Sequence, residues 1–197
     1  MIAIVLSLAT LSSTWCGYQA SQWSGAAGGL HSKADAAERD AAKNALAGMQ
    51  LRTHDGILIM EYWRALRADD TTTSDNLFAH MRPPLQMAIR AAIKEGVLVD
   101  PQVKAPLERP EYLLPQEEEA VRQAAQAREW KAGASEASEN AAGYVPLTLM
   151  FASVLFFGGI TATFGHRGVR VALTIVAIAT FLIAFSILVR LPVHWPS

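Results

Sequence analysis

The stretch VALTIVAIATFLIAFSILV, at residues 171–189, decides the fold class of this 197-residue chain. It contains no charged side chain, and Arg170 and Arg190 bracket it. A helix of this length rises about 28 Å, which is close to the roughly 30 Å of hydrocarbon in a bilayer. The stretch therefore predicts a membrane-spanning helix, to which we assign residues 171–190.

Two more spans are expected. Residues 144–165 are apolar, and the short loop 166–170 joins them to the span above as a tight antiparallel hairpin. Pro146 is expected in the first turn of that helix, where proline costs no hydrogen bond. The first 32 residues lack Asp, Glu, Lys and Arg. Residues 1–23 predict an uncleaved span rather than a cleaved signal peptide, because no basic segment precedes the apolar one.

Charge is concentrated in the middle of the chain. All 18 acidic residues and 14 of the 17 basic ones lie within residues 33–139, an excess of four acidic residues. A nucleic-acid-binding domain needs a concentrated basic face, so that class is excluded. We therefore expect a water-exposed domain at 24–143 between the first two spans, and a short tail at 191–197 after the third.

The inserted domain is predicted to be helical. Residues 31–69 and 116–142 both carry small side chains every three, four or seven positions, a spacing that allows two helices to approach closely. We expect these two helices to pack antiparallel. The alternative is that alanine is simply the strongest helix former. The recurring small residues are Ala34, Ala37, Ala41, Ala45 and Gly48, then Ala120, Ala124, Ala127, Ala134, Ser138 and Ala141.

The path between these helices is predicted from turn and proline signals. Residues 71–74 (TTTS) form a capping cluster, and a helix then runs to about Gly96 with an interruption at 82–84 (RPP). Residues 97–115 hold four prolines and are expected to be an extended loop. The glycine-rich residues 24–29 are expected to be a flexible joint just outside the membrane.

Two signals orient the protein in the membrane. The loop 166–170 carries Arg167 and Arg170, and short basic loops stay in the cytoplasm. Aromatic residues mark the opposite interface. We therefore expect the N-terminus inside, and the 24–143 domain and the C-terminus outside. The aromatic residues are Trp15, Tyr18, Trp23, Tyr144 and Trp195.

The sequence carries no recognisable catalytic, cofactor-binding or metal-ligating motif. The best polar cluster is His54, Asp55, Glu61 and Arg64, in which His54 and Glu61 are seven residues apart and share a helix face. An acid–base site there is the enzyme alternative. A solvated or interhelical polar patch is the favoured interpretation, so we predict a protein that is not an enzyme, with no cofactor and no assigned binding residues.

Several stretches resemble a group of uncharacterised bacterial inner-membrane proteins. They are Trp15-Cys16-Gly17-Tyr18-Gln19-Ala20 with Trp23, Arg82-Pro83-Pro84, Ala105-Pro106 with Pro110-Glu111-Tyr112, and LMFASVLFFGGI at 149–160. That group is a domain of unknown function with one N-terminal span, a helical middle domain and a C-terminal two-span hairpin. The resemblance implies a bacterial inner-membrane location and no activity.

These observations favour a partner-binding or scaffold subunit that acts through its extracytoplasmic helical domain. The expected partners are the lipid bilayer and either another protein or further copies of the chain. Between their end residues the spans hold no Asp, Glu, Lys or Arg, which argues against a transporter. Two alternatives stay open: a sensory ligand-binding domain that acts through a partner subunit, and a subunit of an oligomeric channel.

Overall fold

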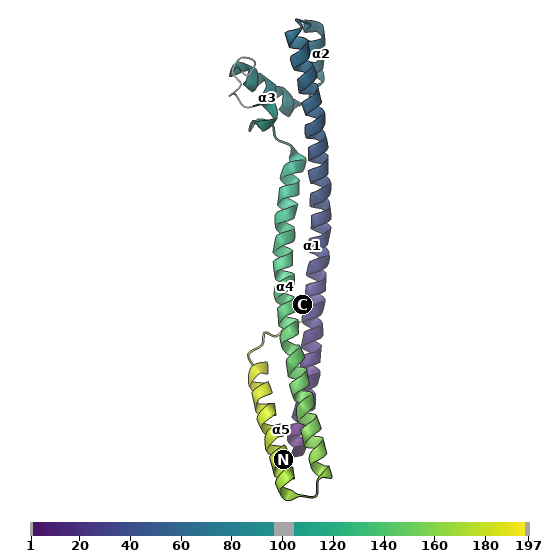
Figure 1. Cartoon of the computed structure of the whole chain (residues 1–197), viewed down its shortest axis with the longest axis vertical. Helices are drawn as coiled ribbons and strands as arrows, with labels where there is room; N and C mark the ends of the chain where they lie inside the picture. The colour runs from purple at the N-terminus through teal and green to yellow at the C-terminus, as the bar shows by residue number, and fades with distance from the viewer. Residues whose placement is uncertain (1, 97–104, 196–197) are drawn as a thin grey trace. The chain divides into compact units, whose positions relative to one another are not determined.

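The computed structural model describes residues 2–96 and 105–195, without the side chains of Ile2 and Ala162. The described residues form helices and connecting turns and contain no strand, so the all-α prediction is confirmed (Figure 1). The elements are α1 (Ile2–Arg67), α2 (Thr71–His80), α3 (Pro83–Lys94), the 3-10 helix η1 (Pro106–Glu108), α4 (Pro115–Ile160), the 3-10 helix η2 (Thr161–Thr163) and α5 (Arg167–Leu188).

The chain divides into two compact units. Unit 1 comprises Met1–Ala34 and Arg128–Ser197, and unit 2 comprises Asp35–Ala127. The long helices α1 and α4 each contribute to both units.

Unit 1 is built from α1, α4 and α5. Near the start of α1, Leu6 lies so close to Gly158 of α4 that a Cβ added to the glycine would clash with Leu6 Cδ2. Further along, Leu30 faces Gly133. The two helices therefore run antiparallel. Their shared core with α5 comprises Ala9, Cys16, Tyr144, Leu147, Phe151, Val154, Ala177 and Ala184.

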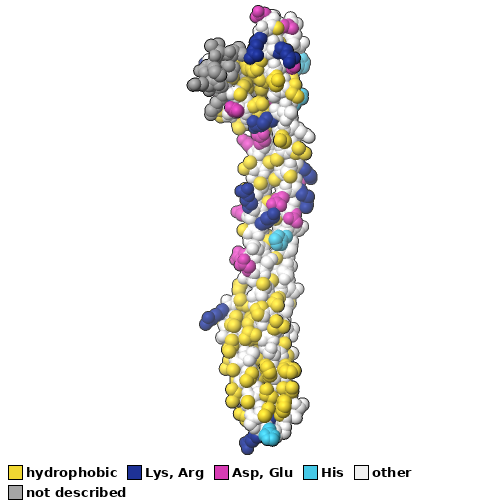
Figure 2. Space-filling model, viewed as in Figure 1, with side chains coloured by type: hydrophobic (Ala, Val, Ile, Leu, Met, Phe, Trp, Pro, Cys, Tyr) yellow, Lys and Arg dark blue, Asp and Glu magenta, His cyan; other side chains and the backbone are white. Residues whose placement is uncertain are grey.

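In the part of the chain that the structure describes, two helices, α4 and α5, are long and apolar enough to cross a membrane. Only Ala177 and Ala184 of α5 are buried, so most of its apolar surface faces outward, and hydrophobic side chains cover the visible face of this unit (Figure 2). The N-terminal segment of α1 does not reach the same apolarity, because it is interrupted by hydroxyl residues such as Ser7, Thr10 and Thr14. A third span at 1–23 stays a prediction.

The predicted flexible joint at 24–29 was wrong. These residues lie inside α1, where the helical hydrogen bonds continue across the glycines because Ala27 is buried and holds the segment in place. Pro146 also lies inside a helix rather than in its first turn, since α4 begins at Pro115. The proline removes one backbone hydrogen bond, and burial of Tyr144 and Leu147 beside it offsets that loss.

Within unit 2, α1 and α4 pack against each other through small residues. Ala41 and Gly48 of α1 and Ala120 and Ala127 of α4 are buried at seven-residue spacing. Asn44 Nδ2 donates to Gln123 Oε1 at 3.0 Å between the helices. The predicted antiparallel packing of two small-residue faces is confirmed. In the predicted set, Ala45 and Ser138 are exposed instead, because both lie at the edge of the α1–α4 contact rather than at its centre.

The rest of unit 2 folds onto the end of α1. Asp70 caps α2, with its Oδ1 accepting from the Thr73 N–H at 3.0 Å. The predicted break near Arg82 is confirmed, since α2 ends at His80 and α3 begins at Pro83. Of the predicted 97–115 loop, 97–104 lie outside the described residues. The remainder contains the short helix η1 and leads into α4. The core here comprises Ile59, Tyr62, Met81, Leu85, Ala88, Ile89, Tyr112 and Leu114.

Candidate interaction site

A buried carboxylate connects three segments of unit 2. Asp55 of α1 is 1% exposed, and its Oδ2 accepts from the Arg82 guanidinium and from the Tyr112 hydroxyl, the latter at 2.7 Å. Arg82 immediately precedes α3, and Tyr112 lies between η1 and α4. A charge taken out of water needs such partners, so Asp55 fixes the position of both segments against α1.

Arg52 makes a second connection one turn earlier on α1. Its guanidinium binds Glu117 in a bidentate manner, with Nε–Oε1 at 3.0 Å and Nη2–Oε2 at 2.7 Å. Its Nη1 donates to the Leu107 carbonyl at 2.8 Å, and its Cζ lies 5.3 Å from the centroid of the Tyr112 ring. We call Arg52, Asp55, Arg82, Tyr112 and Glu117 the polar interlock.

The side chains of the polar interlock form hydrogen bonds and ion pairs with one another. Burial, followed by the hydrogen bond to Asp55, raises the pKa of Tyr112 above its usual range, so the phenol keeps its proton at neutral pH. The hydrogen bonds that Arg52 donates to Glu117 raise the pKa of Arg52, which stays charged. The arrangement holds helices in register, and sequence inspection found only Asp55 of its five members.

The structure does not gather His54, Glu61 and Arg64 around one cavity. The His54 side chain is 71% exposed. Glu61 pairs with Arg64 at 3.0 Å on the surface of α1. A pocket of about 490 Å³ between α1 and α2 is lined by His54 and His80 together with Leu58, Thr73, Asn76 and Leu77, without Glu61. Among the described residues, no three His, Cys, Asp or Glu side chains form a group that could hold a metal ion.

The outer face of α1 in unit 2 carries four large apolar residues, with the exposed Thr53 among them. Leu46, Met49, Ile57 and Met60 are 56%, 66%, 58% and 66% exposed. At 100° per residue, these four positions fall within a sector of about 80°. They lie nearly opposite the buried residues Gly48, Asp55 and Tyr62. We call the four residues the α1 stripe. Sequence inspection missed it, although the helical spacing of Leu46, Met49, Ile57 and Met60 was the available signal.

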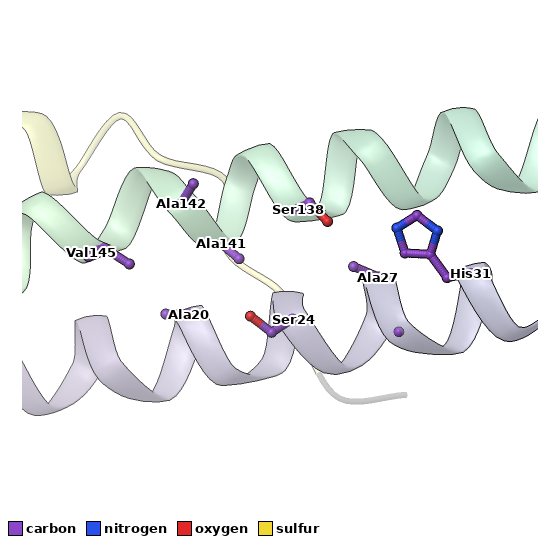
Figure 3. Close-up of a pocket in the computed structure, with 9 residues that line it drawn as sticks. Ala20, Ser24, Ala27, His31, Ser138, Ala141, Ala142 and Val145 are labelled. Carbon is purple, nitrogen blue, oxygen red and sulfur yellow. The ribbon is translucent and has the colours of Figure 1, made fainter.

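Unit 1 contains a groove between α1 and α4 with a volume of about 460 Å³ (Figure 3). Ala27 and His31 of α1 point toward α4, and Ser138 and Ala141 of α4 point toward α1. Small side chains at these positions leave the groove unfilled. A row of small residues does not by itself define a ligand, so the groove is a feature of close helix packing.

The segment after α5 is hydrogen-bonded to α1 and α4. Gln19 is fully buried, and its side chain exchanges two hydrogen bonds with the His194 backbone, at 2.9 and 3.3 Å. Trp23 Nε1 and the Tyr144 hydroxyl both donate to the Pro192 carbonyl, at 3.1 and 2.8 Å. We call these contacts the tail latch. It brings together aromatic residues from the predicted interfacial set.

No family model, curated protein or solved structure matches this chain. The described residues define an all-helical protein with two helices apolar enough to span a membrane. The similarity to uncharacterised bacterial inner-membrane proteins stays a prediction.

Proposed function

We propose that this chain is a membrane-anchored binding protein of the bacterial inner membrane, without catalytic activity. In this proposal unit 1 supplies the anchor, and the α1 stripe of unit 2 binds an amphipathic helix of a second protein. The α1 stripe is the observation that carries the proposal. Single exposed apolar residues are common on protein surfaces, but an aligned row of four on one helix face is typical of an interaction site.

The chemistry of the α1 stripe suits a helical partner. Two of its four residues are methionines, whose flexible and polarisable side chains adapt to an incoming surface. The stripe follows one side of a regular helix, the arrangement by which two helices interdigitate their side chains. The opposite face of this part of α1 is already occupied by α4 and the unit 2 core. A partner therefore has one accessible face to use.

Charge at the ends of the α1 stripe indicates a second protein rather than a second copy. Asp35 lies in line with the stripe before Leu46, and Arg64 and Arg67 lie in line with it after Met60. Two copies anchored in one membrane would run parallel and place these arginines beside the same arginines of the other copy. Like charges oppose that pairing. A partner helix that carries carboxylates at the arginine end of the stripe would instead attract these arginines.

The proposed orientation places unit 2 outside the cytoplasm, with the N-terminus and the 166–170 loop inside. Alkaline phosphatase fused at Ala105 is then expected to be active, and the same enzyme fused at Gly168 inactive. The reverse pattern would place the α1 stripe in the cytoplasm and rule out an extracytoplasmic partner.

Site-specific photo-crosslinking in the native membrane tests the partner. A photoreactive residue is placed singly at Met49, at Met60 and at Val121, an apolar α4 residue that is 72% exposed. We expect Met49 and Met60 to yield the same adduct with one protein, identified by mass spectrometry, and Val121 to yield none. Raising the salt concentration should weaken the adduct, because contacts between Arg67 and carboxylates of the partner lie at the surface.

Two results would overturn the proposal. Adducts at twice the mass of the chain would assign the stripe to a second copy. Equal adducts at Val121 and Met49 would show contact without a preferred face.

A further inference from the structure

A cavity in unit 1 lies beside the first turns of α5. It has a volume of about 500 Å³ and is lined by Arg167, Arg170, Val171, Thr174 and Ile175 of α5 and by Thr161 of η2. The α5 residues are spaced at three and four positions and therefore share one helix face. Two guanidinium groups and two branched apolar side chains thus line the same hollow.

The two arginines have no counter-charge. Neither forms an ion pair within the described residues, and no Asp or Glu follows Glu139 in the sequence. The hydroxyls of Thr161 and Thr174 already donate to the carbonyls of Phe157 and Arg170, at 2.7 and 2.8 Å. Both arginines are exposed, and their guanidinium donors are therefore free to bind an anion at this cavity.

The lining changes from charged to apolar along α5. Arg167 and Arg170 lie at the start of the helix, and Val171 and Ile175 lie one to two turns further along the apolar stretch. In a bilayer, the start of a spanning helix lies at the headgroup level and later turns lie in hydrocarbon. A ligand that fits this order carries an anionic group joined to a hydrocarbon chain.

We infer that this cavity binds an anionic phospholipid, with its phosphate on Arg167 and Arg170 and its acyl chain along Val171 and Ile175. Arginine is suited to this role because its planar fork donates two hydrogen bonds to one phosphate. Basic pockets beside membrane helices recognise lipid headgroups in the same way. This inference rests on the membrane-anchoring part of the proposed function, and it is independent of the α1 stripe.

Native mass spectrometry of the full chain in mild detergent tests the site. The delipidated protein is mixed with phosphatidylglycerol, phosphatidylcholine or inorganic phosphate. The test variant is Arg167→Lys with Arg170→Lys, which keeps the charge that orients the loop and removes the bidentate fork. The control variant is Arg190→Lys, since Arg190 lies just after α5 and outside this cavity. Circular dichroism checks that each variant stays helical.

We expect one phosphatidylglycerol to bind to wild type and to Arg190→Lys, with about tenfold weaker binding to the double variant. Millimolar inorganic phosphate should leave the bound lipid in place. Unchanged binding by the double variant, or equal binding of phosphatidylcholine, would overturn the inference. Displacement by inorganic phosphate would assign a free-anion site instead. Recovery of the chain from the soluble fraction without detergent would sink the membrane anchor itself, a separate failure.

Discussion

The two units both expose large apolar side chains, but in different patterns. On α5 of unit 1, exposed residues such as Val171, Val176 and Phe185 point in several directions around the helix. On α1 of unit 2, the exposed large apolar residues form one narrow row, the α1 stripe. An apolar surface that surrounds a helix fits lipid on most sides, whereas a single row fits one protein partner. Similar exposed fractions of single apolar residues therefore indicate contact with lipid in unit 1 and contact with a protein partner in unit 2.

The units also differ in what holds their helices together. Unit 1 uses small residues, aromatic contacts such as Phe151 against Phe181, and the tail latch. Unit 2 adds the polar interlock around Asp55. In lipid, close packing and hydrogen bonds must associate helices, because burial from water is not available there. In water, buried ion pairs fix geometry only where every charged group has a partner.

The largest expected effect comes from removing the centre of the polar interlock. Asp55→Ala leaves the Tyr112 hydroxyl and the Arg82 guanidinium without their acceptor. We expect unit 2 to lose about 3 kcal/mol of unfolding free energy, the lower end for a broken buried pair because Arg82 is partly exposed. Chemical denaturation in detergent measures the loss. Asp35→Ala on the exposed surface of the same helix should change it by less than about 0.5 kcal/mol. Equal effects of the two would contradict the interlock.

A smaller loss of unfolding free energy is expected when larger side chains replace the alanines through which α1 and α4 pack. Ala127→Leu inserts three carbons at a fully buried position, and such overpacking typically costs about 1–3 kcal/mol. Ala41→Leu should act in the same direction from the facing helix. Ala125→Leu, at an exposed position of α4, is the control and should leave the thermal midpoint nearly unchanged. If Ala127→Leu also leaves it unchanged, the close packing is wrong.

Breaking the tail latch should destabilise the attachment of the tail by about 1–2 kcal/mol. Gln19→Leu keeps the size of the side chain but leaves the His194 N–H without its acceptor. We expect carboxypeptidase to remove the C-terminal residues faster from this variant than from Gln22→Leu, its half-buried neighbour. Identical digestion rates would show that the latch does not hold the tail.

The smallest effect concerns the ionisation of Tyr112. Its pKa is raised, so its hydrogen bond to Asp55 contributes stability below the unfolded value of about 10 and loses it as pH rises through the folded value. The difference between phenolate titrations of wild type and Tyr112→Phe isolates this group. We expect a midpoint well above pH 10. A midpoint at or below about 10 would mean that Tyr112 is not held by Asp55.

Much of the helical architecture is predictable from the sequence, whereas the polar interlock and the α1 stripe are harder to predict. The apolar run at 171–189 and the alanines at seven-residue spacing identify α5 and the α1–α4 pair, because lipid and close packing both select composition directly. The glycines at 24–29 led to the wrong prediction of a flexible joint, because a helix that is packed on both sides of this segment continues through it. The polar interlock joins Asp55 to residues 27 and 57 positions away, and no local pattern predicts such long-range pairs.

Cysteine accessibility in native membranes tests the difference between the two units most directly. In a Cys16→Ala background, single cysteines replace Ile175 of α5, which is 60% exposed, and Val121 of unit 2, which is 72% exposed and lies outside the α1 stripe. A water-soluble maleimide added to membranes opened on both sides should label the Val121 position. It should label the Ile175 position only after detergent is added. Labelling of both positions without detergent would show water around α5 and contradict the membrane anchor.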